Sequence, residues 1–149
     1  MKKYRLFLHL LIASISLLMP AISKATTADD VLSVVKNSEI AINSGDIEKS
    51  RLFYTNDARI YTPYLKKEVE LKDFISAVSA QNSKMYRNRF EIRDLAIVQL
   101  TESEATVMKS FTLIISNQDS RGPRYFNATT EYKLRNEAGC WKIYYQKTQ

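Results

Sequence analysis

The chain has 149 residues, of which 45% are hydrophobic and 26% are charged, and it contains a single cysteine. This balance excludes a disordered chain, a disulfide-stapled scaffold and a two-domain enzyme, and it indicates one globular domain. The 22 lysines and arginines exceed the 16 acidic residues, which gives a formal net charge of +6. A charge of this sign would suit an anionic partner such as a nucleic acid.

The first 25 residues are expected to form a secretory signal peptide. A basic start precedes an apolar run over Leu6–Met19, and Ser23 and Ala25 place small residues at positions −3 and −1 of a cleavage site. The run is shorter than the roughly 20 residues of a membrane-spanning helix, and Pro20 follows it, which disfavours a retained anchor. We expect cleavage after Ala25, one domain over residues 26–149, a secreted or periplasmic location and no stable membrane anchor after cleavage.

Cleavage would change both the charge and the chemistry of the domain. Four positive charges would leave with the leader, so the net charge would fall from +6 to +2; they are Lys2, Lys3, Arg5 and Lys24. The leader also contains His9, the sole histidine. A domain without an imidazole can neither run Ser-His or Cys-His chemistry nor build a His-ligated zinc site. We therefore expect no nucleic-acid partner, no metal and no cofactor.

Three helices are expected in the first half of the domain. Thr27 can cap the first, whose acidic first turn suits the helix dipole. Its apolar stripe has helical spacing and ends before Gly45; the stripe comprises Val31, Val34, Val35, Ser38, Ala41 and Ile42. Asp46 can cap a second, shorter helix that carries Ile47, Leu52 and Phe53. A third helix is predicted from Leu71 to about Asn82, with Leu71, Phe74, Ile75 and Val78 on its apolar face.

The remaining segments alternate with the period of strands. Ala58–Thr62 predicts a short strand that Pro63 closes, and a charged loop is expected over residues 66–70. Four longer strands follow with short connections, as in antiparallel hairpins; they are Arg89–Leu100, Glu104–Ser116, Arg124–Asn136 and Cys140–Lys147. Helices followed by a meander predict an α+β fold, with three helices on one face of a curved antiparallel sheet.

Alternation also assigns side chains to the buried face of the sheet. In the last strand we expect Trp141, Ile143 and Tyr145 on this face, and Cys140 as a small buried hydrophobe rather than a reactive thiol or an interchain disulfide. Lys109 falls on the otherwise apolar face of its strand, where a buried ammonium needs a partner or a function. The favoured interpretation of Lys109 is nevertheless a register change that turns it outward, or snorkelling at the sheet margin.

The order of these elements resembles a known superfamily. Residues 34–63 contain a helix, the segment Asn43-Ser44-Gly45-Asp46, a second short helix, and the segment Phe53-Tyr54-Thr55-Asn56-Asp57-Ala58 before a strand. This stretch looks like the opening of nuclear transport factor 2-like domains, the group that contains the SnoaL-like cyclases and ketosteroid isomerase. The third helix and the meander match in order and length. The resemblance implies a cone that encloses a pocket, often in a homodimer formed through the outer sheet face.

The resemblance can be followed into the isomerase site. It places Ser38 at the oxyanion-binding tyrosine, Thr62 at the aspartate that acts as general base, and Thr130 near the second oxyanion donor. All three positions hold hydroxyls. A threonine cannot abstract a proton near pH 7, so ketosteroid isomerase chemistry is excluded.

The resemblance also implies which other residues lie near the pocket. Its lining is expected to include Ser38, Tyr54, Thr62, Thr130, Tyr132 and Trp141. Asp57 and Tyr61 lie near it in the family layout, and with Lys109 they are the acid-base candidates of an enzyme. For Asp57 the favoured interpretation is a local role, in which it caps the strand start or pairs with Arg59.

Three functions remain open from the sequence. The favoured one is a non-catalytic binding or assembly module, whose pocket holds a small apolar ligand or is closed by side chains. The second is a SnoaL-like isomerase, cyclase or dehydratase that uses Asp57, Tyr61 and Lys109. The third is a component of a secretion machinery, because an inner-membrane protein of type IV secretion shares the fold.

Overall fold

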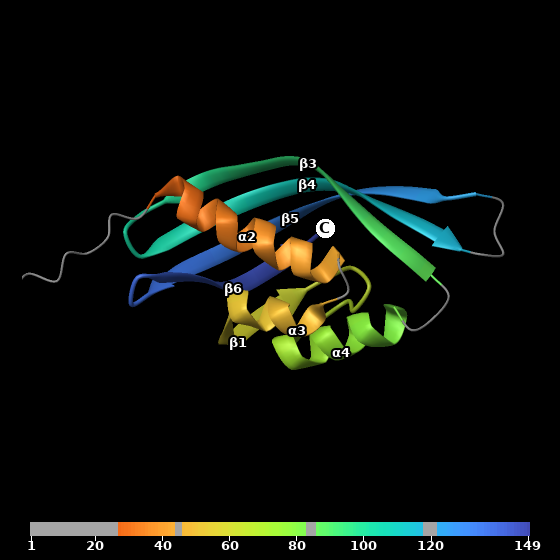
Figure 1. Ribbon diagram of the computed structural model, residues 1–149, viewed down its shortest axis with the longest axis horizontal. Coiled ribbons are helices and arrows are strands. Elements are labelled where there is room, and N and C mark those ends of the chain that lie inside the picture. Colours follow the sequence, from red (N-terminus) through yellow and green to blue (C-terminus); the bar gives the residue numbers. More distant parts are fainter. Residues whose placement is uncertain (1–26, 44–45, 83–85, 118–121) are drawn as a thin grey trace, which may run out of the picture.

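The computed structural model describes residues 27–43, 46–82, 86–117 and 122–149. The expected signal peptide and its cleavage site lie outside these residues. Three helices and a short 3-10 turn cover a curved six-stranded sheet (Figure 1). The α+β class and the helices-first order predicted from the sequence are confirmed. No helix in the described segments is both long and apolar enough to cross a membrane.

Helix α2 (Ala28–Asn43) begins as the sequence predicts. The Thr27 hydroxyl accepts a hydrogen bond from the Asp30 amide at 3.2 Å, and the Asp30 carboxylate accepts one from the Thr27 amide at 3.2 Å. This reciprocal pair satisfies two backbone groups that the first helical turn leaves unpaired. The inner face of α2 carries Val31, Val35 and Ser38, none of which exposes any surface.

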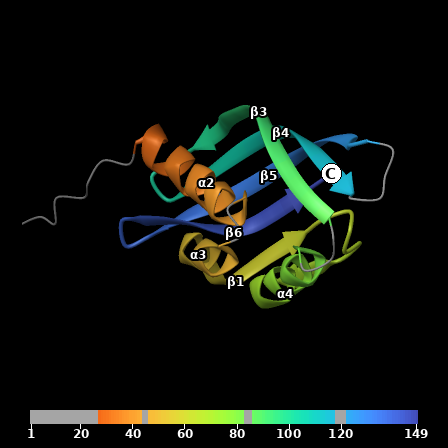
Figure 2. The same ribbon diagram turned by 45° about the vertical axis from the view of Figure 1, so that its right-hand side comes forward.

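The two shorter helices lie at the other end of the sheet. Helix α3 (Ile47–Ser50) starts where Asp46 accepts a hydrogen bond from the Lys49 amide at 3.1 Å, and the 3-10 turn η1 (Arg51–Phe53) extends it. Helix α4 (Leu71–Asn82) has the predicted bounds. Figures 1 and 2 show α2 running across the concave face of β3–β6, whereas α3 and α4 lie beside β1.

The six strands form one sheet in the order β2-β1-β6-β5-β4-β3. They are β1 (Tyr54–Tyr61), β2 (Glu68–Glu70), β3 (Tyr86–Leu100), β4 (Glu104–Asn117), β5 (Arg124–Glu137) and β6 (Cys140–Thr148). The four-stranded meander is confirmed. The sheet is antiparallel except between β1 and β6, which run parallel. Hence the expectation of a purely antiparallel sheet is wrong at this one junction.

Several local features depart from the alternation read in the sequence. β1 begins at Tyr54 rather than Ala58 and ends before Thr62, and β3 carries register shifts after Ile92 and Ile97. The expected loop over 66–70 contains β2, an edge strand of three residues in which only Val69 is buried. In β6, Leu134 pairs with Ile143 but Lys133 pairs with Tyr145, so Tyr144 is an extra residue in the ladder. This β-bulge keeps Ile143 inside, turns Tyr145 outward and brings Gln146 into the core, where it is 5% exposed. The expected inward position of Tyr145 is therefore wrong.

The core lies between α2 and the concave side of the sheet. Its members come from α2 and from β1, β2, β4, β5 and β6; the residues with no exposed surface are Val31, Val35, Ala58, Ile60, Val107, Tyr132, Leu134 and Ile143. Each Val, Ile or Leu of this set contributes roughly 1.5–3 kcal/mol through burial. Polar side chains interrupt this core between α2 and the centre of the sheet.

Candidate functional site

A buried ion pair joins α2 to the centre of the sheet. The Lys109 ammonium on β4 lies 2.7 Å from a carboxylate oxygen of Glu39 on α2, with side-chain exposures of 3% and 6%. Lys109 faces inward because it follows the alternation of Ala105, Val107 and Phe111. Strand alternation indicated the apolar face for Lys109, and the structure agrees; the favoured interpretation, an outward turn or snorkelling at the sheet margin, is wrong.

The partner of Lys109 was missed in the sequence. Glu39 follows Val31 and Val35 at intervals of four residues, so all three side chains share the inner face of α2. An inward lysine on a strand demands a nearby carboxylate, because an unpaired buried charge costs several kcal/mol. An acidic residue on the apolar stripe of the covering helix was the signal that could have identified it.

Aromatic groups surround the ion pair. The Tyr132 hydroxyl donates to the same Glu39 oxygen that contacts Lys109. The ammonium lies 4.3 Å from the centre of the Phe111 ring and 5.6 Å from that of Tyr132, distances at which a cation is attracted to an aromatic face. Burial lowers the pKa of Lys109, and the Glu39 carboxylate opposes this shift. Burial, reinforced by the charge of Glu39, raises the pKa of Tyr132, so this phenol stays a neutral donor.

A second chain of hydrogen bonds lies beside the ion pair. The Tyr54 hydroxyl donates to the Gln146 side-chain oxygen at 2.6 Å and accepts from the Ser38 hydroxyl at 3.3 Å. The Ser50 hydroxyl donates to the Ser38 carbonyl at 3.5 Å. Burial raises the pKa of Tyr54 well above that of a free phenol. Gln146 reaches this position only because of the bulge at Tyr144. We call Ser38, Glu39, Tyr54, Lys109, Tyr132 and Gln146 the interior polar cluster.

The remaining pocket candidates have local roles. Thr130 is 1% exposed, and its hydroxyl lies 2.9 Å from that of Thr148. The Thr62 hydroxyl accepts from the Leu65 amide at 3.3 Å and so belongs to the turn after β1. Trp141 is 6% exposed and borders a hollow of about 290 Å³ at the start of α2. Cys140 also borders this hollow and is exposed, which makes its expected burial wrong.

Two acid-base candidates lie on the opposite side of the sheet from Lys109. The Asp57 carboxylate, 68% exposed, contacts Arg135 of β5 at 2.7 and 3.3 Å, rather than Arg59. Tyr61 points outward from β1, because Ala58 and Ile60 hold the inward positions. The three residues named for an enzyme therefore do not converge on one site.

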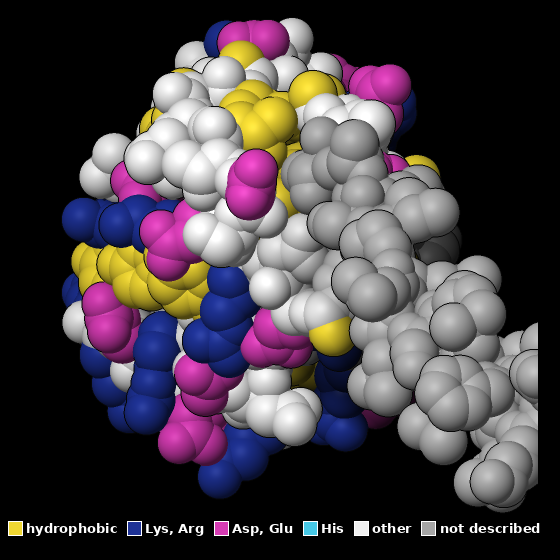
Figure 3. Space-filling model, turned by 90° about the vertical axis from the view of Figure 1, so that its left-hand side faces the viewer, with side chains coloured by type: hydrophobic (Ala, Val, Ile, Leu, Met, Phe, Trp, Pro, Cys, Tyr) yellow, Lys and Arg dark blue, Asp and Glu magenta, His cyan; other side chains and the backbone are white. Residues whose placement is uncertain are grey.

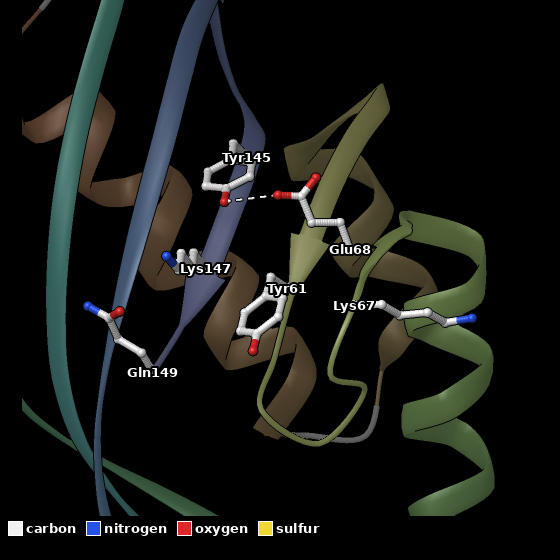
Figure 4. A pocket seen from close by; sticks show the side chains of 6 residues that line it. All are labelled: Tyr61, Lys67, Glu68, Tyr145, Lys147 and Gln149. Carbon is white, nitrogen blue, oxygen red and sulfur yellow. Dashed lines mark hydrogen bonds between the residues drawn. The ribbon is translucent and has the colours of Figure 1, made fainter.

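The outer face carries a groove of about 560 Å³ at the junction of β1, β2 and β6 (Figure 4). Its lining comprises Tyr61, Lys67, Glu68, Tyr145, Lys147 and Gln149. The Tyr145 hydroxyl donates to a Glu68 carboxylate oxygen at 3.2 Å. In the figure Tyr145 lies beside Glu68, Lys147 projects from β6 at a height between the Tyr145 and Tyr61 rings, and Lys67 extends toward α4. The bulge in β6 is what turns Tyr145 toward this groove.

The chemistry available to the interior polar cluster is limited by its own contacts. The ammonium and the carboxylate neutralise each other, and both phenols are held protonated by burial. The described residues contain no group of three or more acidic, histidine or cysteine side chains placed to hold a metal ion. Lys and Arg side chains alternate with Asp and Glu on the end of the molecule seen in Figure 3, with no separate basic area in that view.

Comparison with known proteins identifies the fold. No protein-family model and no curated protein matches the sequence. A ketosteroid isomerase-like protein from Erwinia carotovora atroseptica superposes with a TM-score of 0.65 at 19% identity, over 83% of this chain and 96% of that one. The association domain of CaMKII from C. elegans gives 0.66 at 13% identity, over 81% and 93%. A protein with a cystatin-like fold from Caulobacter vibrioides gives 0.68 at 11% identity, over 81% and 87%. The chain thus has the nuclear transport factor 2-like fold.

Proposed function

We propose that this chain is a non-catalytic assembly module that forms a homodimer through the outer face of its sheet. The observation that carries the proposal is the middle of the outward row of β4, where the five outward side chains that follow Glu104 are all uncharged and form an uncharged row: Thr106, Met108, Ser110, Thr112 and Ile114. Charged residues flank this row on both neighbouring strands, among them Asp94 on β3 and Glu131 and Lys133 on β5. A charge-free centre with a polar rim is typical of protein interfaces.

The interior supports a structural role for the fold. The charges of Lys109 and Glu39 are satisfied within the interior polar cluster, and Asp57 and Tyr61 lie on the other side of the sheet. General acid-base catalysis needs its groups within hydrogen-bond reach of one substrate position. The enzyme alternative built on these residues therefore lacks a common site. The structural likeness to an association domain agrees with an assembly role but, at 13% identity, it extends to the fold alone.

Light scattering after size-exclusion chromatography tests the proposal. We expect the mass of two chains for the wild type, and the mass of one chain for Ser110→Glu and Met108→Glu. These substitutions place a carboxylate in the uncharged row, and Ser110 already faces Asp94 across the ladder. Lys142→Glu on β6 is the control, since it places a carboxylate outside the row and changes the net charge by two units rather than one, a larger change than either test substitution. The proposal is overturned if the wild type stays monomeric at every concentration while its circular dichroism shows that the chain is folded.

A second candidate, a small apolar ligand, is favoured by one feature of the inner face. Phe90, Leu113 and Phe126 form a row across β3, β4 and β5, and Phe126 is 48% exposed although it points to the inner side. Exposed apolar side chains that adjoin a core are a common entrance for ligands. Native mass spectrometry of the protein from its own host tests this candidate. Added mass that is lost in Phe126→Ser supports it, and unliganded protein in every preparation refutes it.

We also propose that the domain acts after export, with the leader removed. This rests on the basic start, the apolar run and the small residues at 23 and 25. Intact-mass analysis of the protein from its host tests it: a chain that begins at Thr26 is expected. A mass that includes residues 1–25 would contradict removal of the leader and would revive the anchored, secretion-machinery alternative.

A further inference from the structure

The groove at the junction of β1, β2 and β6 has a lining that suits one class of ligand. Its volume, about 560 Å³, lies within the roughly 300–1,000 Å³ of small-molecule sites. The lining contains two phenols, two ammonium groups, one carboxylate and one amide, but no aliphatic side chain. An acyl chain would therefore find no apolar wall here. A carbohydrate has both a CH face, which packs on aromatic rings, and hydroxyls, which need polar partners.

The two tyrosines of the groove have different surroundings. Tyr145 has contacts at its hydroxyl and at its ring, because the hydroxyl donates to Glu68 at 3.2 Å and the Lys133 ammonium lies 5.5 Å from the ring centre. Tyr61, its neighbour on β1, faces the groove beside it (Figure 4). Tyr61 is thus the ring on which a sugar can stack, and Tyr145 forms the wall that orients Glu68 as an acceptor.

The charged side chains of the groove are not all paired with one another. Lys147 lies in a cross-strand row between Tyr61 and Glu131. Glu131 already contacts Lys133 at 3.4 Å, and Glu68 accepts from Tyr145. Among the described residues, Lys147 has no ion-pair partner within 4.0 Å. An unpaired ammonium beside an aromatic ring favours a ligand that brings its own carboxylate.

We propose that this groove binds an acidic carbohydrate. A sugar ring packs against Tyr61, its hydroxyls contact the side chains of Glu68 and Gln149, and its carboxylate contacts Lys147. The site is separate from the uncharged row of β4, and it requires neither the dimer nor the interior polar cluster. No covalent step is involved.

The test is calorimetric titration of the full chain with matched sugars. Sialyllactose and lactose differ by one acidic sugar, oligogalacturonate and oligoglucuronate extend the acidic set, and sodium acetate supplies a carboxylate without a sugar. We expect at least one acidic sugar to bind with a dissociation constant near about 1 mM or below, and its neutral counterpart to bind about tenfold more weakly. Tyr61→Ala and Lys147→Gln should each weaken acidic binding by about tenfold.

Two controls lie on the same outer face outside the groove. Tyr125→Ala removes an exposed ring from β5, and Lys142→Gln removes an ammonium from the same strand as Lys147; neither should change sugar binding. Failure of every acidic sugar to bind overturns the proposal. So does equal binding of sialyllactose and lactose, or acetate that competes fully with the sugar. If Tyr61→Ala and Lys147→Gln instead convert a dimer to a monomer, the groove is an interface between two copies and the proposal also fails.

Discussion

Removing one partner of the Lys109–Glu39 pair should destabilise the domain far more than removing both. At the observed 2.7 Å and an effective dielectric constant of about 20, the attraction is about 6 kcal/mol. Desolvation of two ions costs several kcal/mol each, so the net contribution of the intact pair is small. Lys109→Met or Glu39→Gln alone leaves a buried charge and should lower the free energy of unfolding by about 3–5 kcal/mol.

The double variant tests whether the cost comes from the orphaned charge. Lys109→Met keeps an unbranched side chain against Phe111, and the amide carbonyl that Glu39→Gln introduces can still accept from Tyr132. We expect the double variant to lie within about 2 kcal/mol of the wild type, which makes the coupling energy between the two sites several kcal/mol. Urea unfolding at pH 7, followed by circular dichroism, measures all four proteins.

An exposed ion pair of the same sheet serves as the matched control. Asp57 and Arg135 also lie 2.7 Å apart, but on the outer face, with side-chain exposures of 68% and 38%. The same cycle with Asp57→Asn and Arg135→Gln should give a coupling energy of about 1 kcal/mol or less. If the single changes at Lys109 and Glu39 cost no more than this, and simply add in the double variant, the reasoning from burial is refuted.

Three further predictions concern the same fold. Tyr54→Phe should cost about 1–3 kcal/mol in urea unfolding, because the buried Gln146 oxygen loses its donor; a cost equal to that of an exposed change, Tyr64→Phe, would contradict the contact. Thr27→Ala should cost about 1 kcal/mol through the lost cap of α2, whereas Thr27→Ser should restore most of it. In the Lys109→Met/Glu39→Gln background, stability should still fall above pH 10. Burial is the main cause that raises the folded pKa values of Tyr54 and Tyr132, and it persists without the charge of Glu39, so the unfolded chain loses these protons first. The free energy of unfolding should then fall by up to about 1.4 kcal/mol per pH unit for each phenol. Tyrosinate absorbance that rises fully before unfolding would contradict this.

The spacing of apolar residues predicted most of the helices and strands, because the apolar positions of α2, α4 and the meander follow the periods of regular helices and strands. The prediction failed where a β-bulge interrupts the two-residue alternation of a strand. The extra residue at Tyr144 inverts the rest of β6 relative to simple alternation, and nothing local in the sequence marks it. The edge strand β2 was missed because Val69 is its single buried residue, too little for a pattern.

The site was harder to predict than the fold, for a different reason. Ser38, Tyr54 and Tyr132 do enter the interior polar cluster, together with Lys109. Glu39 and Gln146 escaped notice because each is polar and its inward direction depends on a partner distant in the sequence, Lys109 and Tyr54 respectively. Asp57 and Tyr61 were assigned to the pocket from the family layout, but strand alternation places them on the far side of the sheet. A residue type that fits a reaction is not evidence of its orientation.

Because of the bulge at Tyr144, β6 has one residue more than its ladder with β5 requires, and this matters when related sequences change in length. Deletion of this codon would remove only the extra residue of the ladder. Ile143 and Gln146 would still point inward and Tyr145 outward, as they do now. The ladder between β4 and β5 runs without a shift from Glu104 to Ile115 and holds no such spare residue. A one-codon deletion there would invert every side chain beyond it. Among related genes, one-residue deletions should therefore be tolerated in β6 and should be absent from β4, the strand that carries Lys109.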